Sequence, residues 1–170
     1  MKKQIQNISS VAIPLIMSTT FAIADVGHNA GAAFGQAGTL DDVDRTIAIS
    51  MDEMDFGPES IEVKEGETIR FVVKNIGKVV HEFNIGTRET WRSHDKEMRS
   101  MFRKKMITMR RVNHEKMAAS GMMHEDPNSV LLEPGQSGEV IWTFAEKTEM
   151  GFACNVPGHR NAGMIGKVVF

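Results

Sequence analysis

The fold is decided by one stretch near the carboxyl end of the chain, Cys154-Asn155-Val156-Pro157-Gly158-His159-Arg160-Asn161-Ala162-Gly163-Met164. A thiolate, an imidazole and a thioether follow one another here in Cys-x4-His-x4-Met spacing. Three donors of these kinds on one short loop suit copper. The rigid proline and the permissive glycines before His159 and Met164 fit a loop that must aim several side chains at one point.

A second imidazole would complete the donor set. A blue-copper electron-transfer site is a trigonal set of two histidines and one cysteine with a weak axial methionine. His81 is the candidate because it lies in the run Val79-Val80-His81-Glu82-Phe83, which is typical of a strand. Taken singly, His81 fits a buried core histidine and Met164 fits a core filler. The four donors taken together indicate copper ligands.

The chain has a single cysteine, Cys154. In an exported protein paired cysteines become disulfides, so a lone one is free, metal-bound or intermolecular. A buried inert thiol is the alternative interpretation. The nearby histidine and methionine favour a metal ligand, and the predicted copper ligands are His81, Cys154, His159 and Met164.

The amino terminus has the pattern of an export signal. Lys2 and Lys3 precede an apolar run from residue 8 to residue 23, and Ala22-Ile23-Ala24 is a small-x-small cleavage site. Residues 1–24 are therefore predicted to be a signal peptide that is cleaved after Ala24, which places the mature chain in the periplasm. An uncleaved membrane anchor is the alternative, but Pro14 and several hydroxyl residues interrupt the run.

The charge balance excludes one class of partner. Without Lys2 and Lys3 the mature chain has 18 basic and 22 acidic residues, a formal charge of −4. A chain of that charge does not suggest nucleic-acid binding. No second stretch is long and apolar enough to predict a membrane span in the mature chain.

Alternating apolar residues predict an all-β domain over residues 45–170. Residues 25–44 come first, and their Gly/Ala-rich composition predicts a flexible leader. From Arg45 onward, apolar and polar residues alternate in two groups of short segments separated by Gly and Pro turns. Seven or eight such strands predict an antiparallel β-sandwich. The apolar positions that define them are Ile47, Ile49, Met51, Ile61, Val63, Ile69, Phe71, Val73, Val130, Leu132, Val140, Trp142 and Phe144.

Residues 87–126 interrupt this alternation. Trp91, Met98 and Met101 recur at helical spacing, and the pattern continues to Met109 and Val112. Forty residues exceed an ordinary loop between strands, so we expect an inserted helical segment. Thr87 is its expected N-cap and Gly121 its expected stop.

These motifs resemble those of the cupredoxins, the family of plastocyanin, azurin, auracyanin and rusticyanin. The resemblance covers residues 45–86 and 127–170. It rests on His81-Glu82-Phe83, on Cys154-x-x-Pro157-Gly158-His159 running to Gly163-Met164-x-Gly166, and on two further motifs, Met54-x-Phe56-x-Pro58 and Ile61-x-Val63-x-x-Gly66-x-Thr68-Ile69-x-Phe71. It implies a Greek-key β-sandwich, one type 1 copper held by the four residues above, and electron entry at His159 near the surface. The chain is closest in kind to periplasmic copper-resistance cupredoxins, which combine this core with extra Met and His residues.

The insert is rich in methionine. Seven of the 13 methionines lie between residues 98 and 123, and thioethers select Cu(I) in an oxidising compartment. Core or interface packing is an equally good interpretation of methionines at helical spacing. The candidates for weak secondary Cu(I) sites are Met98, Met101, Met106, Met109, Met122, Met123 and His124.

The insert is also basic. Six Lys or Arg residues and no acidic residue lie between Arg99 and Arg111, and Arg160 stands beside His159. An ordinary solvated helix face is the simpler interpretation. The functional one is docking to an acidic redox partner, since such patches steer encounter.

Two functions fit the sequence best. The first is a periplasmic type 1 copper protein that carries electrons and serves copper tolerance, with extra Cu(I) captured by the insert. The alternative is a plain electron carrier to a respiratory or copper-enzyme partner, with the insert serving as packing or docking surface. A copper oxidase or nitrite reductase needs a second histidine-rich copper site, but only His28, His94, His114 and His124 remain. We therefore expect no enzymatic activity.

Overall fold

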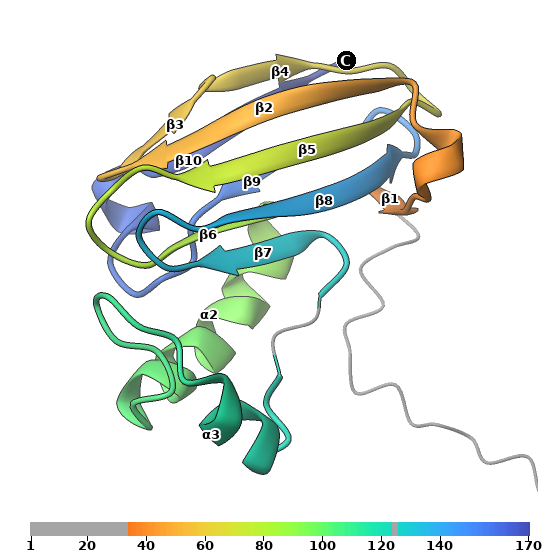
Figure 1. Cartoon of the computed structure of the whole chain (residues 1–170). Helices are drawn as coiled ribbons and strands as arrows, with labels where there is room; N and C mark the ends of the chain where they lie inside the picture. The colour runs from red at the N-terminus through yellow and green to blue at the C-terminus, as the bar shows by residue number, and fades with distance from the viewer. Residues whose placement is uncertain (1–33, 124–125) are drawn as a thin grey trace, which may run out of the picture.

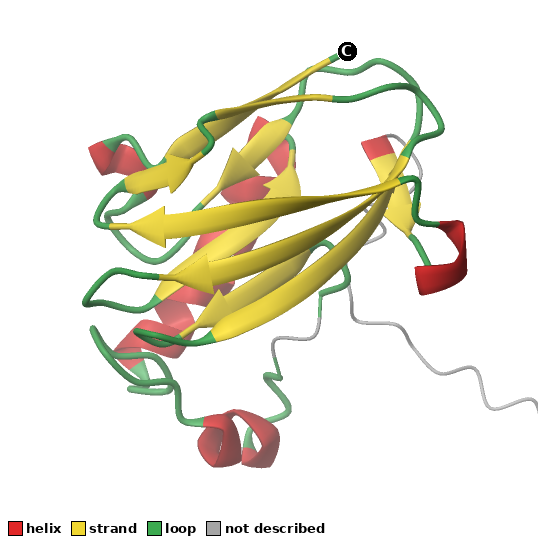
Figure 2. Cartoon of the chain, turned by 45° about the horizontal axis from the view of Figure 1, so that its top comes forward, coloured by secondary structure: helices red, strands yellow, loops and turns green. Residues whose placement is uncertain are grey.

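A computed structural model describes residues 34–123 and 126–170, which form two five-stranded sheets in layers (Figures 1 and 2). The first sheet has the strand order β1 (Gly35–Ala37), β8 (Ser137–Phe144), β5 (Thr68–Asn75), β2 (Arg45–Asp52) and β3 (Asp55–Gly57). The second has the order β4 (Ser60–Glu62), β10 (Ile165–Val169), β9 (Gly151–Ala153), β6 (His81–Gly86) and β7 (Ser129–Leu132). The chain is mostly β, and the predicted β-sandwich is confirmed.

Apolar side chains from the two sheets meet between the layers. Phe71 of β5 lies 5.3 Å from Phe83 of β6, and Phe56 of β3 lies 5.1 Å from Phe152 of β9, measured between ring centroids. Aromatic rings at such distances contribute beyond the area they bury. This core fixes β6 and β9 against the first sheet, and those two strands position the candidate ligands.

Two strand pairs differ from the expected antiparallel arrangement. β2 pairs with β5, and β4 with β10, in parallel. Between β2 and β5 the chain crosses to the second sheet as β4 before it returns, and β4 and β10 are far apart in sequence. Neither pair is therefore joined by a tight turn, which would require antiparallel strands. β1 and β3, each three residues long, were not expected at all.

Residues 34–44 depart from the expected flexible leader. Phe34 is buried and stacks on Trp142 with ring centroids 5.3 Å apart. β1 continues from it and pairs antiparallel with β8, and the short 3-10 helix Leu40–Asp42 follows. Burial of the aromatic ring therefore outweighs the low core-forming capacity of the surrounding Gly and Ala residues. Residues 25–33, and the predicted signal peptide, lie outside the described residues.

The insert contains two helices, α2 (Arg88–Arg103) and α3 (His114–Ala119). Thr87 caps α2 in a capping box with Thr90, as expected at this position. The helical pattern does not continue through Met109 and Val112, because the chain turns at Lys105, where φ is +56°, and forms an antiparallel bridge between Ile107 and Val112. In Figure 1 both helices lie on the side of the sandwich that carries β7.

Helix α2 lies close to the second sheet because two glycines leave room for it. A Cβ atom on Gly86 would lie 2.9 Å from the indole nitrogen of Trp91, and one on Gly151 would lie 3.4 Å from the same ring. Every residue of β6 is consequently buried, where a strand with one solvated face would alternate. Among the described residues, no helix has the length and apolar character needed to cross a membrane.

Candidate metal centre

Three candidate ligands converge from two neighbouring strands. His81 opens β6 and Cys154 follows β9, and the pairing of Asn84 with Ala153 brings the two strands together. The sulfur of Cys154 lies 3.9 Å from Nδ1 of His81 and 3.3 Å from Nδ1 of His159. Within the described part of the chain these three residues form the cluster able to hold a metal ion, with donor atoms all within 4.8 Å of one another.

The ligand loop is closed by its own backbone. Met164 accepts a hydrogen bond from the Cys154 amide at 3.2 Å and donates one to the His159 carbonyl at 3.1 Å. Gly163 has a φ of +107°, which favours glycine and turns the chain back toward β10. The fourth predicted ligand, Met164, is thus buried and tied through its backbone to Cys154 and His159.

Burial sets the protonation of the three donors. Burial raises the pKa of the Cys154 thiol to about 12. Burial, together with the charge of His159, lowers the pKa of His81 to about 4, and burial also lowers the pKa of His159. At neutral pH the site therefore offers two neutral imidazoles and a thiol whose proton a bound metal ion would displace.

The donor set fits copper. One sulfur and two imidazole nitrogens, all buried from water, are the trigonal ligands of blue-copper sites. The Glu82 amide donates to the Cys154 sulfur at 3.3 Å, which stabilises negative charge on that sulfur. His159 is only 4 % exposed, so it is less accessible to solvent than we expected of a surface residue at which electrons enter.

Sequence reasoning missed the polar residues around these ligands. Glu82 is fully buried, and its Oε2 accepts hydrogen bonds from the amide and the side chain of Asn155, at 3.0 and 2.8 Å. Arg160 donates to Oδ1 of Asn155 at 2.8 Å. Arg160 is therefore half-buried and hydrogen-bonded within the site, and it is not the exposed docking charge expected beside His159. The sequence offered one signal of this network, which is that the charged residue Glu82 lies within the apolar run that ends at Phe83.

The methionines of the insert fall into two groups. Met98, Met101 and Met106 are buried in the hydrophobic core, which favours packing for them. Met109 is 53 % exposed and Met123 44 % exposed. Met122 is half-buried, and its sulfur accepts a hydrogen bond from Lys104. The remaining candidate for a secondary Cu(I) site, His124, lies outside the described residues.

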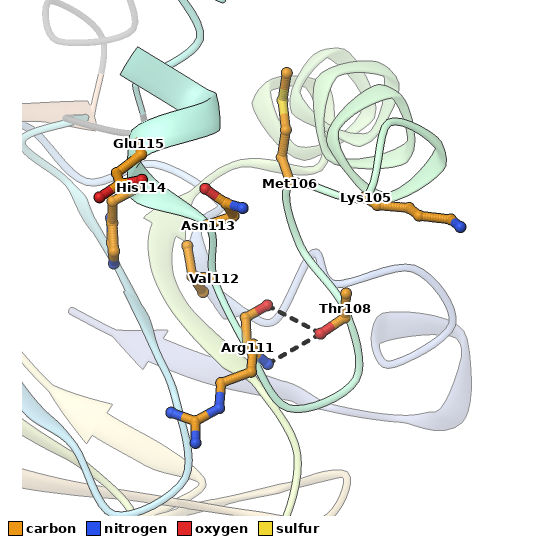
Figure 3. Close-up of a pocket in the computed structure, with 8 residues that line it drawn as sticks. All are labelled: Lys105, Met106, Thr108, Arg111, Val112, Asn113, His114 and Glu115. Atoms are coloured by element: carbon orange, nitrogen blue, oxygen red, sulfur yellow. Dashed lines mark hydrogen bonds between the residues drawn. The ribbon is translucent and has the colours of Figure 1, made fainter. Parts of the chain in front are cut away.

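A separate shallow pocket opens in the insert (Figure 3). Two hydrogen bonds join Thr108 and Arg111, which both line it, and Met106 and His114 point in opposite directions. The thioether and the imidazole thus do not converge there. The pocket is lined by Lys105, Met106, Thr108, Arg111, Val112, Asn113, His114 and Glu115.

Comparison with known proteins decides the family. The sequence profile of the copper binding proteins of the plastocyanin/azurin family matches residues 42–170. The chain belongs to this family. As a cupredoxin it binds copper, and its cluster of His81, Cys154 and His159 is able to hold the ion. The profile spans the helical insert and every strand of both sheets except β1.

Two curated cupredoxins share the chain's sequence over most of its length. The copper-resistant cuproprotein CopI of Pseudomonas aeruginosa is 44 % identical over 149 residues, covering 81 % of this chain and 82 % of that protein. The protein of the same name from Rubrivivax gelatinosus is 36 % identical and covers 99 % of both chains. These relatives are named for copper resistance.

A solved structure agrees on the fold. Reduced auracyanin from Roseiflexus castenholzii matches with a TM-score of 0.55 at 20 % identity, covering 75 % of this cupredoxin and 97 % of that chain. At this level of identity the match supports the cupredoxin fold alone.

Proposed function

We propose that this cupredoxin is a periplasmic type 1 copper protein that carries electrons through one copper and serves copper tolerance. The observation that carries the proposal is the buried meeting of one thiol and two imidazole nitrogens within 4.8 Å. Copper tolerance is supported by the names of the two CopI relatives. We propose the ligand set predicted from the sequence, which is His81, Cys154, His159 and Met164.

Each proposed ligand has a distinct role. When bound, the copper supplies one-electron exchange between Cu(II) and Cu(I). Cys154 would bind as the thiolate, with the Glu82 amide as a hydrogen-bond donor to its sulfur. The two imidazoles are neutral and buried, so they need lose neither a proton nor a water shell before binding. Met164 would supply the weak axial sulfur.

The Met-rich insert would add capacity for Cu(I). Thioethers that are exposed to solvent can bind an ion without any unfolding of the insert. Met109 and Met123 meet that condition, and Met122 lies beside Met123. The buried group of Met98, Met101 and Met106 would then stabilise the insert.

The first experiment counts the Cu(I) bound by the reduced mature protein in competition with a chromogenic chelator. Two or more equivalents support tolerance through capture. The extra copper should disappear when Met109, Met122 and Met123 are all replaced by leucine. The matched control replaces Met98, Met101 and Met106 by leucine, and it should keep the full count. A single equivalent in the parent protein would contradict capture by the insert.

The alternative function is a plain electron carrier, and the basic surface of the insert favours it. Arg103, Lys105 and Arg110 are exposed in the segment expected to dock an acidic partner. One Cu(I) equivalent, with electron transfer that falls as salt rises, would select this alternative. Export to the periplasm is tested by the amino-terminal sequence of the protein recovered from that compartment, which should begin at Asp25.

A further inference from the structure

The residues that directly follow the three converging ligands are joined in one hydrogen-bonded chain. Glu82 follows His81, Asn155 follows Cys154, and Arg160 follows His159. Asn155 lies in the middle. Its amide and side-chain nitrogens donate to Glu82, and its side-chain oxygen accepts from Arg160 at 2.8 Å. A displacement of any one of these residues should therefore also displace the other two.

Both ends of this chain are attached to helix α2. His94 Nε2 lies 2.8 Å from Oε1 of Glu82, within hydrogen-bonding distance. Arg160 donates to the carboxylate of Asp95 in an ion pair. His94 and Asp95 are consecutive in the helix, so their side chains point about 100° apart. One turn of α2 thus holds both ends of the chain around Asn155.

The attachments are well placed to resist movement. Glu82 is fully buried, and a buried carboxylate is stable only when its oxygens are hydrogen-bonded or paired. Its Oε1 also accepts a hydrogen bond from Ser129 of β7 at 3.1 Å. The side chains of Arg160 and Asp95 are only 17 % and 21 % exposed, so solvent screens their attraction less than at the surface. The Glu82 amide carries this restraint directly to the Cys154 sulfur.

We propose that His94 and Asp95 are positioning residues of the copper site. Helix α2 braces the ligand loop and so sets how Cys154 and His159 meet the metal. The inference rests on the proposed function, because it takes Cys154 and His159 to be copper ligands. It assigns the insert a role that needs no copper of its own, because outer-shell partners orient the ligands and tune the metal.

The test begins with three variants of the copper-loaded protein. Asp95→Asn removes the charge that holds Arg160, and Asp95→Glu restores it. Glu89→Gln is the matched control, since it makes the same chemical change at an exposed position of the same helix. The readouts are the relative intensities of the visible thiolate-to-copper bands, the reduction potential, and the rate of copper loss to a chelator.

For Asp95→Asn we expect altered band intensities, a shifted potential and copper loss faster by about tenfold, in the range known for outer-shell changes. Asp95→Glu should recover most of the parent behaviour, and Glu89→Gln all of it. Arg160→Gln should reproduce the effect of Asp95→Asn, and combining the two should add little, because both break the ion pair between Arg160 and Asp95. At the Glu82 end of the hydrogen-bonded chain, His94→Gln keeps one donor toward Glu82. It should change the visible band intensities less than His94→Leu does.

Two results overturn the proposal, and they differ. If Asp95→Asn matches Glu89→Gln in all three readouts, the brace is refuted even when unfolding curves of the metal-free protein show a loss of stability. If the parent protein has no visible absorption that depends on Cys154, the proposed ligand set is wrong and the brace proposal fails with it.

Discussion

Replacing Met98 by alanine tests whether the insert's buried methionines are packing residues. Met98 is 0 % exposed, lies in α2, and belongs to the hydrophobic core. Burying such a side chain contributes about 1.5–3 kcal/mol, and the cavity left by truncation adds to the loss. We therefore expect Met98→Ala to lower the free energy of unfolding by about 2–5 kcal/mol. A small domain is stable by about 5–15 kcal/mol, so the variant should still fold.

The assay is chemical denaturation of the metal-free protein followed by far-ultraviolet circular dichroism. Met98→Leu conserves volume and should cost less than about 1.5 kcal/mol. Met109→Ala, at an exposed position, should stay within about 0.5 kcal/mol of the parent. A cost below about 1 kcal/mol for Met98→Ala would refute the packing argument, since truncation of a buried methionine costs more. So would loss of one Cu(I) equivalent in Met98→Leu, because leucine packs as well as methionine but cannot bind copper.

Three further predictions concern the site, the surface and the insert. Cys154→Ser should abolish the intense visible absorption of the copper protein, and surviving colour would show that the assigned ligand set is wrong. Replacing Lys105 and Arg110 by glutamate should slow electron transfer with an anionic iron complex by about tenfold at low salt and little at high salt. An unchanged rate would refute docking through this surface. Replacing Lys147 by glutamate is the control. Thr87→Ala should cost about 1 kcal/mol of stability because it removes the capping box of α2. Ser93→Ala, exposed on the same helix, should leave the unfolding midpoint unchanged, and equal midpoints for both variants would count against the capping argument.

The strands with clear alternation could be predicted from the sequence, and the shortest could not. Strands β2, β5 and β8 are eight residues each and show apolar residues at every second position. β1 has no such pattern, because its packing depends on one aromatic ring, Phe34, whose partner Trp142 is distant in sequence. Such a contact is a property of the folded chain and leaves no periodic signal.

The end of α2 could not be predicted from the sequence either. Residues 88–120 contain no glycine or proline, so the sequence pattern predicts that the helix continues. The chain turns at Lys105 with a positive φ, a conformation that usually selects glycine or asparagine. Burial of Met106 and Ile107 after the turn favours this backbone over a longer helix.

At the candidate site the convergence of His81, Cys154 and His159 followed from residue types and spacing. The surrounding polar residues did not, because their importance depends on which strands pair. Glu82 and Asn155 are 73 positions apart, and only the pairing of β6 with β9 brings them into contact. A charged residue directly after a predicted ligand is the sequence feature that pointed toward them.

The stacking of Phe34 on Trp142 bears on how the amino terminus can be processed. β1 covers the outer edge of β8 over three residue pairs. A protease that cut after residue 37 would remove this cover and leave the backbone groups of Trp142, Thr143 and Phe144 unpaired on that edge. Such open edges are templates for pairing with another chain. Loss of residues 34–37 would therefore give β8 an open edge that a second copy of the chain could pair with.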